Sequence, residues 1–246
     1  MVAVELALVR VEVAKASTSL PAALTEGVTQ GASDATCSRL ESNPGPAGVT
    51  ATVTGTAVDD QPEDTYWVVN GQHYNDGCCF DYGNAETNNH DDGAGTMECV
   101  YFGSCGGWGR GAGNGPWVMA DLENGLWAGA DPGINANDTG FSGLPFVTAM
   151  VKGGSNGFAL KGGDATAGPL RTLYDGPRPK GYQPMAKQGS IILGIGGDNS
   201  DGATGSFFEV VVTAGYTSDA ADAAVQANIV AALTDDPNKR TALFAQ

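Results

Sequence analysis

The sequence predicts an all-β protein, and three observations support this fold class. Of the 246 residues, 37 are glycine and only 16% are charged, a composition that fits short strands joined by tight turns. Many short segments alternate apolar and polar side chains or are rich in β-branched and aromatic residues, as strands are. Only one segment has a helical pattern. Because 41% of the residues are hydrophobic, the chain can bury a sizeable core, and these features together favour a β-sandwich.

The predicted elements follow one another at short spacing. Strands are expected at residues 49–58, 66–70, 97–102, 117–123, 146–152, 158–161, 170–174, 191–195 and 207–213. The pair Asn70-Gly71 has the composition of a hairpin turn that would close the second of these strands. One helix is expected at residues 219–233, where an alanine-rich run follows Ser218 as the N-cap. Residues 2–13 fit either a strand or a short amphipathic helix.

The charge balance excludes several classes of partner. With 12 basic and 28 acidic residues the net charge is −16, so nucleic acid and anionic membranes would repel the chain. A neutral polysaccharide is compatible with this charge. No hydrophobic run is long enough to span a bilayer. Residues 1–13 are apolar but interrupted by charges, so no signal peptide is visible.

Residues 117–123 form the first candidate site. Read as a strand, they direct alternate side chains to opposite faces, because the side-chain period of a strand is 2. One face is apolar and suits a core: Val118, Ala120, Leu122. The other face carries two carboxylates beside large apolar side chains: Trp117, Met119, Asp121, Glu123. Acids near an aromatic ring are a common arrangement for holding and cleaving a sugar, although an exposed strand face with two solvated acids has the same pattern.

Residues 191–198 form the second candidate site. As a strand, they place Ile191, Leu193 and Ile195 on one face, suited to the core. The opposite face has Ile192, two glycines and Asp198, and glycines beside an acid leave room for a ligand near the backbone. A calcium loop is an alternative, because Asp198, Ser200 and Glu209 have EF-hand spacing. Against it, Ala203 stands where that loop requires glycine.

Other chemistries fit the sequence poorly. The five cysteines do not have zinc-site spacing, and the two histidines belong to no metal-binding or nucleophile motif. The neighbours Cys78 and Cys79 would close a strained ring if bonded, so their spacing alone favours free thiols. Cys99 and Cys105 can pair only if the chain turns between them, and the partner of Cys37 is open. Two carboxylates on separate strands remain, which is the minimal equipment of a glycosidase.

Four segments resemble glycoside hydrolase family 54, the α-L-arabinofuranosidase B family. They are residues 77–88 with the adjacent cysteines, 115–126, 191–200 and 225–232, and the resemblance covers about residues 59–232. It implies a concanavalin-like jelly-roll β-sandwich with the sugar on one sheet face. It also implies release of terminal non-reducing α-L-arabinofuranosyl groups from arabinan or arabinoxylan with retention of configuration, without a metal or other cofactor.

The resemblance assigns roles to individual residues. Glu123 resembles the family's nucleophile, and Asp198 resembles its general acid/base. Residues that hold the sugar in the family correspond to Trp108, Asp121, Asn124 and the backbone at Gly197. The pair Cys78 and Cys79 resembles the family's vicinal disulfide, which packs against the arabinose.

The resemblance also sets expectations for the whole chain. Residues 1–55 do not resemble the family and are expected to belong to the same sandwich or to be poorly ordered, and residues 56–246 are expected to form the catalytic sandwich. We expect a secreted monomer that binds plant cell-wall polysaccharide. Two alternatives stay open: a lectin-like sandwich without turnover, and a structural or adhesive sandwich without a ligand. Retention of both Glu123 and Asp198 speaks against the last.

Overall fold

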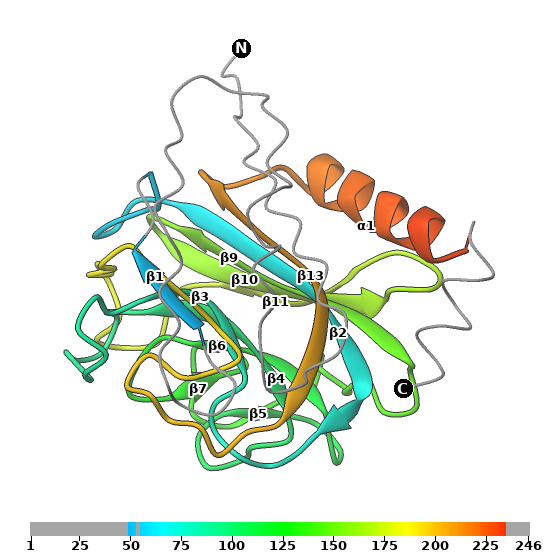
Figure 1. Cartoon of the computed structure of the whole chain (residues 1–246), viewed down its shortest axis with the longest axis horizontal. Helices are drawn as coiled ribbons and strands as arrows, with labels where there is room; N and C mark the ends of the chain where they lie inside the picture. Colours follow the sequence, from blue (N-terminus) through cyan, green and yellow to red (C-terminus); the bar gives the residue numbers. More distant parts are fainter. Residues whose placement is uncertain (1–48, 53–54, 235–246) are drawn as a thin grey trace, which may run out of the picture.

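The computed structural model describes residues 49–52 and 55–234, and two antiparallel sheets form most of this part of the chain (Figure 1). The first sheet has six strands in the order β1 (Val49–Thr52), β12 (Ser190–Leu193), β3 (Asp81–Ala85), β4 (Glu98–Gly103), β6 (Trp117–Asp121) and β7 (Leu126–Trp127). The second has five in the order β11 (Arg171–Gly176), β10 (Gly157–Asp164), β9 (Phe146–Gly154), β2 (Glu63–Tyr74) and β13 (Gly205–Ala214). A small parallel pair joins β5 (Arg110–Gly111) to β8 (Ile134–Asn135).

The main hydrophobic core lies between the two large sheets. The central strands contribute alternate side chains to it, as the pleat of a strand requires. The six-stranded sheet supplies among others Tyr82, Val100, Phe102, Val118 and Ala120, and the five-stranded sheet supplies Trp67, Val69, Val147, Val151, Leu160 and Val210. The predicted jelly-roll β-sandwich is therefore confirmed, and so is the apolar face of Val118, Ala120 and Leu122.

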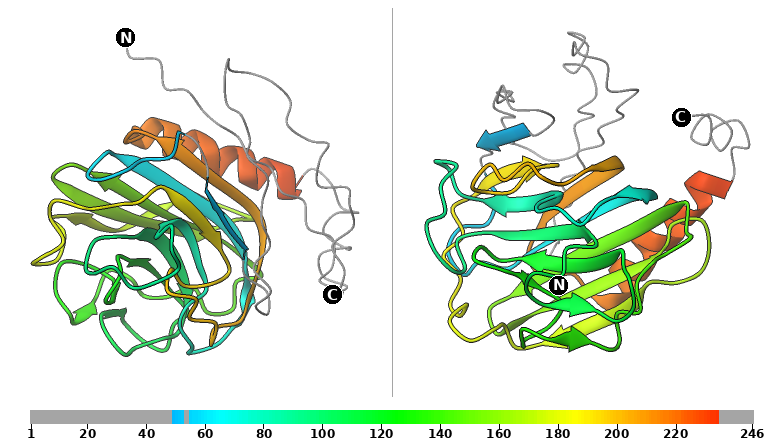
Figure 2. Two further views of the ribbon diagram at one scale, coloured as in Figure 1. Left: turned by 60° about the vertical axis from the view of Figure 1, so that its left-hand side comes forward. Right: turned by 90° about the horizontal axis from the view of Figure 1, so that it is seen from below.

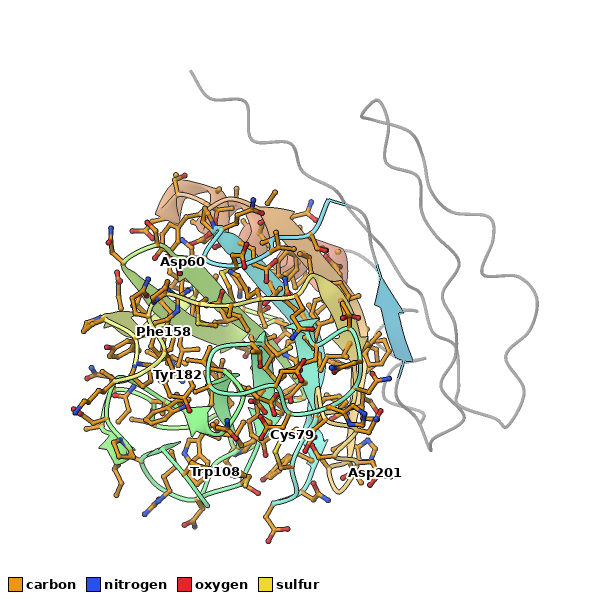
Figure 3. All side chains as sticks on the ribbon, turned by 90° about the vertical axis from the view of Figure 1, so that its left-hand side faces the viewer. Asp60, Cys79, Trp108, Phe158, Tyr182 and Asp201 are labelled. Carbon is orange, nitrogen blue, oxygen red and sulfur yellow. A yellow bond between two sulfur atoms is a disulfide. The ribbon has the colours of Figure 1, made fainter. Side chains whose placement is uncertain are left out.

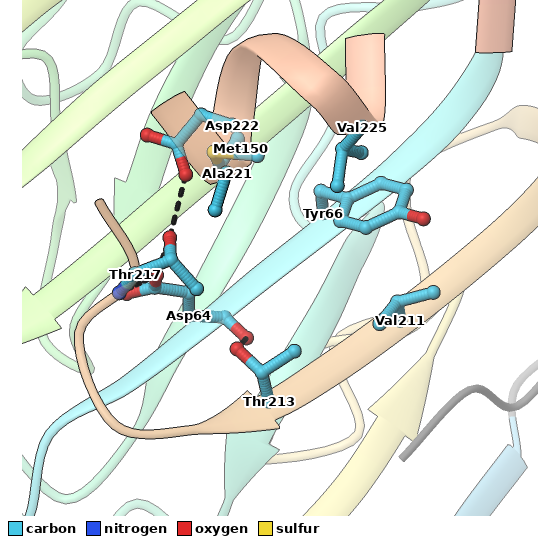
Figure 4. A pocket seen from close by; sticks show the side chains of 9 residues that line it. All are labelled: Asp64, Tyr66, Met150, Val211, Thr213, Thr217, Ala221, Asp222 and Val225. Carbon is cyan, nitrogen blue, oxygen red and sulfur yellow. Dashed lines mark hydrogen bonds between the residues drawn. The ribbon is translucent and has the colours of Figure 1, made fainter. Parts of the chain in front are cut away.

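One helix covers the outer face of the five-stranded sheet. Helix α1 (Asp219–Thr234) packs there with Ile229 against a second cluster that includes Tyr66, Met150 and Val211 (Figure 2). The Ser218 hydroxyl accepts a hydrogen bond from the Ala221 amide (3.2 Å), which confirms the predicted N-cap. Near the start of α1 a small cavity lies between helix and sheet (Figure 4). No helix in the described part of the chain is long and apolar enough to span a membrane.

The outer face of the six-stranded sheet is buried beneath loops instead of a helix. Side chains that alternate with the core residues form two further clusters there. One contains Cys79, Tyr101, Trp117 and Met119, and the other contains Ala85, Met97, Cys99, Ile192 and Ile195. Asp81 and Asp121 belong to the same face by alternation, so polar groups are buried on this side of the sandwich.

Several predicted element boundaries are wrong, and three of these errors have identifiable reasons. The strand predicted at residues 49–58 is shorter, because β1 ends at Thr52 and residues 55–58 are not in a strand. No hairpin turn occurs at Asn70-Gly71, because β2 runs through it; a Cβ at Gly71 would lie 2.4 Å from the Leu144 carbonyl, so close packing explains this glycine. The strand at 117–123 ends at Asp121. The strand at 191–195 ends at Leu193, and Ile195 packs with Ile192 rather than with Ile191. The prediction for residues 2–13 lies outside the described residues.

Candidate active site

The turn between β6 and β7 carries the predicted nucleophile. Its central residues Glu123 and Asn124 both have positive φ, 62° and 56°, and they lie between Leu122 and Gly125 as in a type I′ hairpin turn. The Glu123 amide donates to Oδ1 of Asp121 (3.0 Å). The Glu123 side chain therefore leaves from a left-handed turn and not from the strand face expected from alternation. Such a backbone is costly for a glutamate, and the hairpin holds it in place.

Asp121 forms a carboxyl pair with Asp81 on the outer face of the sheet. The two residues come from β6 and β3, on either side of β4, and their side chains are hydrogen bonded to each other. Burial raises the pKa of Asp121 to about 7. Burial and the Asp121 charge raise the pKa of Asp81 well above its usual range. Two carboxyl groups form a hydrogen bond only if one of them is protonated, so this pair retains a proton at mildly acidic pH.

Glu123 forms a second carboxyl pair with Glu86, the residue directly after β3. Both are buried, at 6% and 0% exposure. Burial, the charges of Glu86 and Asp121, and the hydrogen bond that protonated Glu123 donates to Glu86 raise the pKa of Glu123 to about 9. Within the described residues, no lysine or arginine forms an ion pair with Glu86, Asp121 or Glu123.

The turn after β12 brings Asp198 to this site. A Cβ at Gly197 would lie 2.3 Å from Oε2 of Glu86 and 3.3 Å from Oε2 of Glu123, so the backbone of Gly197 lies directly against the carboxyl pair. The next residue, Asp198, is exposed and accepts a hydrogen bond from the Ser200 amide (2.8 Å). The structure therefore places a buried carboxyl, Glu123, and an exposed one, Asp198, on neighbouring turns.

Cys78, Cys79 and Trp108 border the same region. A disulfide joins the two cysteines, and Sγ of Cys79 lies 3.2 Å from Oδ2 of Asp121. Trp108 is 47% exposed, and a Cβ at Gly125 would lie 3.4 Å from its ring. Figure 3 shows Cys79 and Trp108 on the side of the molecule away from α1. An exposed aromatic ring and a sulfur pair thus flank the carboxyl groups.

Asn124 contacts the protein rather than open space. In the amide orientation that satisfies both atoms, its nitrogen donates to Asp91 (2.6 Å) and its oxygen accepts from the Ala94 amide (3.1 Å). Tyr182 donates to the Asn124 carbonyl (3.1 Å). The side chain of Asn124 therefore holds the β6–β7 turn against the 91–94 loop, and its role in binding sugar stays a prediction.

Neither a calcium loop nor a further disulfide is present in the described residues. Glu209 lies within β13 and accepts a hydrogen bond from Tyr66 (3.0 Å), so the segment from Asp198 is not folded as an EF-hand loop. Cys99 and Cys105 are both buried and free, and Cys37 lies outside the described part. The one group of close metal ligands found in that part is Cys78, Cys79 and Asp121. Its sulfur atoms are bonded to each other and are not thiolate ligands.

Three site residues were missed by sequence reasoning: Asp81, Glu86 and Tyr182. The first two lie in the segment 77–88 that carried the resemblance, and an acid in an otherwise buried strand is a signal that was available. Tyr182 has no such signal, because its hydrogen bond to Asn124 spans 58 residues of sequence.

The fold and the site define a β-sandwich protein with a carboxyl-rich site on one outer sheet face. The family described as "Alpha-L-arabinofuranosidase B, catalytic" matches residues 14–234, and the chain belongs to this family, glycoside hydrolase family 54. The match includes residues before position 59, where the resemblance read from sequence began.

Named relatives agree with this assignment. The chain is 58% identical over 181 residues to the α-L-arabinofuranosidase B of Aspergillus niger. This match covers 73% of this chain and 36% of the relative. It is 59% identical over 180 residues to an α-L-arabinofuranosidase of Hypocrea jecorina, covering 72% and 36%. The chain thus spans about a third of the length of the relatives it matches.

Solved structures of the family share the fold. A glutamate-to-glutamine variant of a GH54 α-L-arabinofuranosidase soaked with 4-nitrophenyl α-L-arabinofuranoside is 55% identical with a TM-score of 0.74, covering 75% of this chain and 39% of that one. An arabinofuranosidase complexed with arabinofuranosyl-α-1,2-xylobiose is also 55% identical over the same shares, with a TM-score of 0.73.

Proposed function

We propose that this chain is a retaining α-L-arabinofuranosidase that releases terminal non-reducing arabinofuranosyl groups from arabinan, arabinoxylan or related hemicellulose. The observation that carries the proposal is the meeting of the Glu123 turn and the Gly197-Asp198 turn beside the Cys78–Cys79 pair. Membership of the arabinofuranosidase B family supports the substrate class.

Glu123 acts as the nucleophile in the first step. One of its carboxylate oxygens attacks the anomeric carbon and forms an ester, while the bond between that carbon and the leaving oxygen breaks. The electron pair of the broken bond goes to the leaving oxygen, which takes a proton from Asp198. Burial of Glu123 suits this role, because water that would compete with the sugar is kept away.

Asp198 acts as acid and then as base. After the aglycone departs, ionised Asp198 removes a proton from water, and the resulting hydroxide attacks the anomeric carbon and restores the Glu123 carboxylate. The exposed position of Asp198 supports this assignment, since the leaving group and the incoming water both pass on the solvent side. We expect the two carboxyl groups to lie about 5–5.5 Å apart, as in other retaining enzymes.

The remaining residues hold the sugar. Asp121 accepts hydrogen bonds from sugar hydroxyls. The backbone at Gly197 faces the sugar ring, and the residue there must be glycine because a Cβ would collide with Glu86. The Cys78–Cys79 disulfide forms an apolar platform, and Trp108 offers a ring face at the exposed edge. Asn124 keeps the catalytic turn in position. We further propose that the protein is a secreted monomer, consistent with a net charge of −16 and a neutral polysaccharide substrate.

The test is hydrolysis of 4-nitrophenyl α-L-arabinofuranoside, followed by proton NMR of the first sugar product. Release of the α-anomer before mutarotation supports a retaining arabinofuranosidase. Release of the β-anomer refutes the retaining mechanism. Binding of the arabinoside without turnover supports the lectin-like alternative and refutes the enzyme.

A further inference from the structure

The turn that carries Glu123 has a backbone conformation that needs support from outside the hairpin. Glu123 and Asn124 both have positive φ, which residues other than glycine rarely adopt. Across the turn the Leu122 amide donates to the Gly125 carbonyl at 3.5 Å, which is long for a hydrogen bond. A catalytic group must keep its productive position to within about 0.5 Å. Contacts from other segments therefore matter for the direction of the Glu123 side chain.

The loop of residues 91–95 holds one side of this turn. The Gly95 amide donates to the Leu122 carbonyl (2.7 Å), and the side chain of Asn124 is hydrogen bonded to the same loop. These bonds fix the residue before Glu123 and the side chain of the residue after it. The backbone carbonyl of Asn124 has a different partner, which comes from another part of the chain.

Tyr182 is that partner. Its hydroxyl donates to the Asn124 carbonyl (3.1 Å). Its ring is buried and packs edge-to-face against the ring of Trp127 in β7, with the ring centroids 5.2 Å apart. Burial and the charges of Asp121 and Glu123 raise the pKa of Tyr182, so the hydroxyl keeps its proton and remains a donor.

The segment that carries Tyr182 is fixed at both ends to one buried carboxylate. Arg178 and Lys187 each form an ion pair with Glu98 on β4, with nitrogen–oxygen distances of 2.7 Å. All three side chains are buried, so solvent screens these pairs little. Because β4 pairs with β6, the segment and the turn that carries Glu123 are both attached to the same sheet. Tyr182 thus reaches the turn from a fixed support.

We propose that Tyr182 is a positioning residue that directs Glu123 at the anomeric carbon by fixing the peptide group between Asn124 and Gly125. This inference rests on the proposed function. Tyr182 acts through the backbone of the turn and takes no part in the transfer of a proton or of the sugar. Without its hydroxyl this peptide group can rotate, and the Glu123 carboxylate then spends less time in line with the sugar.

Hydrogen exchange of the Glu123 amide tests the proposal without turnover, because this amide donates to Asp121 while the turn keeps its shape. In Tyr182→Phe, which removes only the hydroxyl, the exchange rate of this amide should rise about tenfold. The matched control is Tyr174→Phe in β11 of the other sheet, since the Tyr174 hydroxyl also donates to a backbone carbonyl, that of Pro177 (2.6 Å). It should leave exchange at Glu123 unchanged. An unchanged exchange rate in Tyr182→Phe overturns the proposal.

Activity provides a separate measurement. Tyr182→Phe should lower kcat about tenfold with little change in KM, because binding of the sugar does not require the reactive orientation of Glu123. Tyr174→Phe loses a hydrogen bond of the same kind and should keep the kcat of the wild type. Equal kcat in Tyr182→Phe and the wild type overturns the positioning role, and so does an equal loss of kcat in both variants. A chain that hydrolyses no arabinoside refutes the proposed function, whereas amide exchange still tests Tyr182.

Discussion

Asp222 under the helix and the two acids Asp121 and Glu123 on the opposite outer face of the sandwich are buried with different partners. Under helix α1, Asp222 accepts hydrogen bonds from Lys152 (2.7 Å) and Lys161 (2.6 Å). Burial alone would raise the pKa of Asp222, but these lysines outweigh it and hold that pKa below its usual value. On the other face no lysine or arginine of residues 55–234 forms an ion pair with Asp121 or Glu123, and burial raises their pKa values to about 7 and about 9.

This difference separates a carboxyl group that stabilises the fold from the two for which we propose a role in the reaction. The pairs of Asp222 link β9, β10 and α1, and Thr217 adds a further hydrogen bond to it (Figure 4). Within the part of the chain that the structure describes, Asp121 and Glu123 form no ion pair that would link two elements. Their buried environment disfavours the ionised carboxylate. The proposed nucleophile needs this ionised form for the reaction, and in the free protein the same form lowers stability.

The largest expected effect comes from removing the charge of the nucleophile. Glu123→Gln should lower kcat by at least about a thousandfold, because the amide cannot form the covalent intermediate. The Tm of this variant should equal or exceed that of the wild type, since the substitution removes a buried acid with a raised pKa. Steady-state kinetics and calorimetry check both statements. Near-normal activity would remove Glu123 from the mechanism.

The next largest effect is expected from removing a cation that pairs with Asp222 under helix α1. Lys152→Met should lower the free energy of unfolding by about 3–5 kcal/mol, because it leaves the buried Asp222 with one cation fewer. The folded variant should retain its KM. Lys180→Met at an exposed position is the control and should change stability by no more than about 0.5 kcal/mol. Equal stabilities of the two variants in urea denaturation would show that the Asp222 pairs do not stabilise the fold.

Close packing at Gly197 predicts an effect on catalytic efficiency. Gly197→Ala places a methyl group 2.3 Å from Glu86, so the carboxyl pair must shift, and kcat/KM should fall about a hundredfold. Gly133→Ala is a suitable control, because a Cβ there meets no atom within 4 Å. If both variants have the same kcat/KM, the approach of Gly197 to the pair is unimportant for catalysis.

The smallest effect concerns the dependence of stability on pH. The folded pKa of Asp121, about 7, lies above its unfolded value near 3.8, so the folded state binds more protons and stability falls as pH rises from about 4 to 7. Asp222, with a lowered pKa, loses its contribution as pH falls. Asp121→Asn should therefore be more stable than the wild type at pH 8 and no more stable than the wild type at pH 4. A gain that is equal at both values would contradict the raised pKa.

The sequence predicted the apolar framework better than the site geometry. Alternation at Val118 and Ala120 and the N-cap at Ser218 depend on local periodicity, and both are confirmed. The position of Glu123 was predicted from alternation that in fact ends at Asp121. A type I′ turn directs the Glu123 side chain to the outer face of the sheet, where Asp121 also lies. The alternation of apolar and polar residues does not predict this turn.

Contacts distant in sequence account for the rest. The pairing of Glu86 with Glu123 and the approach of Gly197 depend on the order β12-β3-β4-β6, which brings together segments far apart in the chain. Strand alternation supplied the candidates Glu123 and Asp198, and the resemblance to the family supplied their roles. Neither indicated that a third carboxyl, Glu86, is buried near Glu123.

Labelling with an α-L-arabinofuranosyl cyclic sulfate tests the central claim most directly, because such a compound forms an ester with a nucleophilic carboxylate. A GH54 relative has been soaked with a cyclic sulfate inhibitor. After reaction, intact-mass analysis and peptide mapping should show one added inactivator, attached to Glu123, and Glu123→Gln should take up none. An ester on Asp121, on Asp198 or on any other residue would contradict the account.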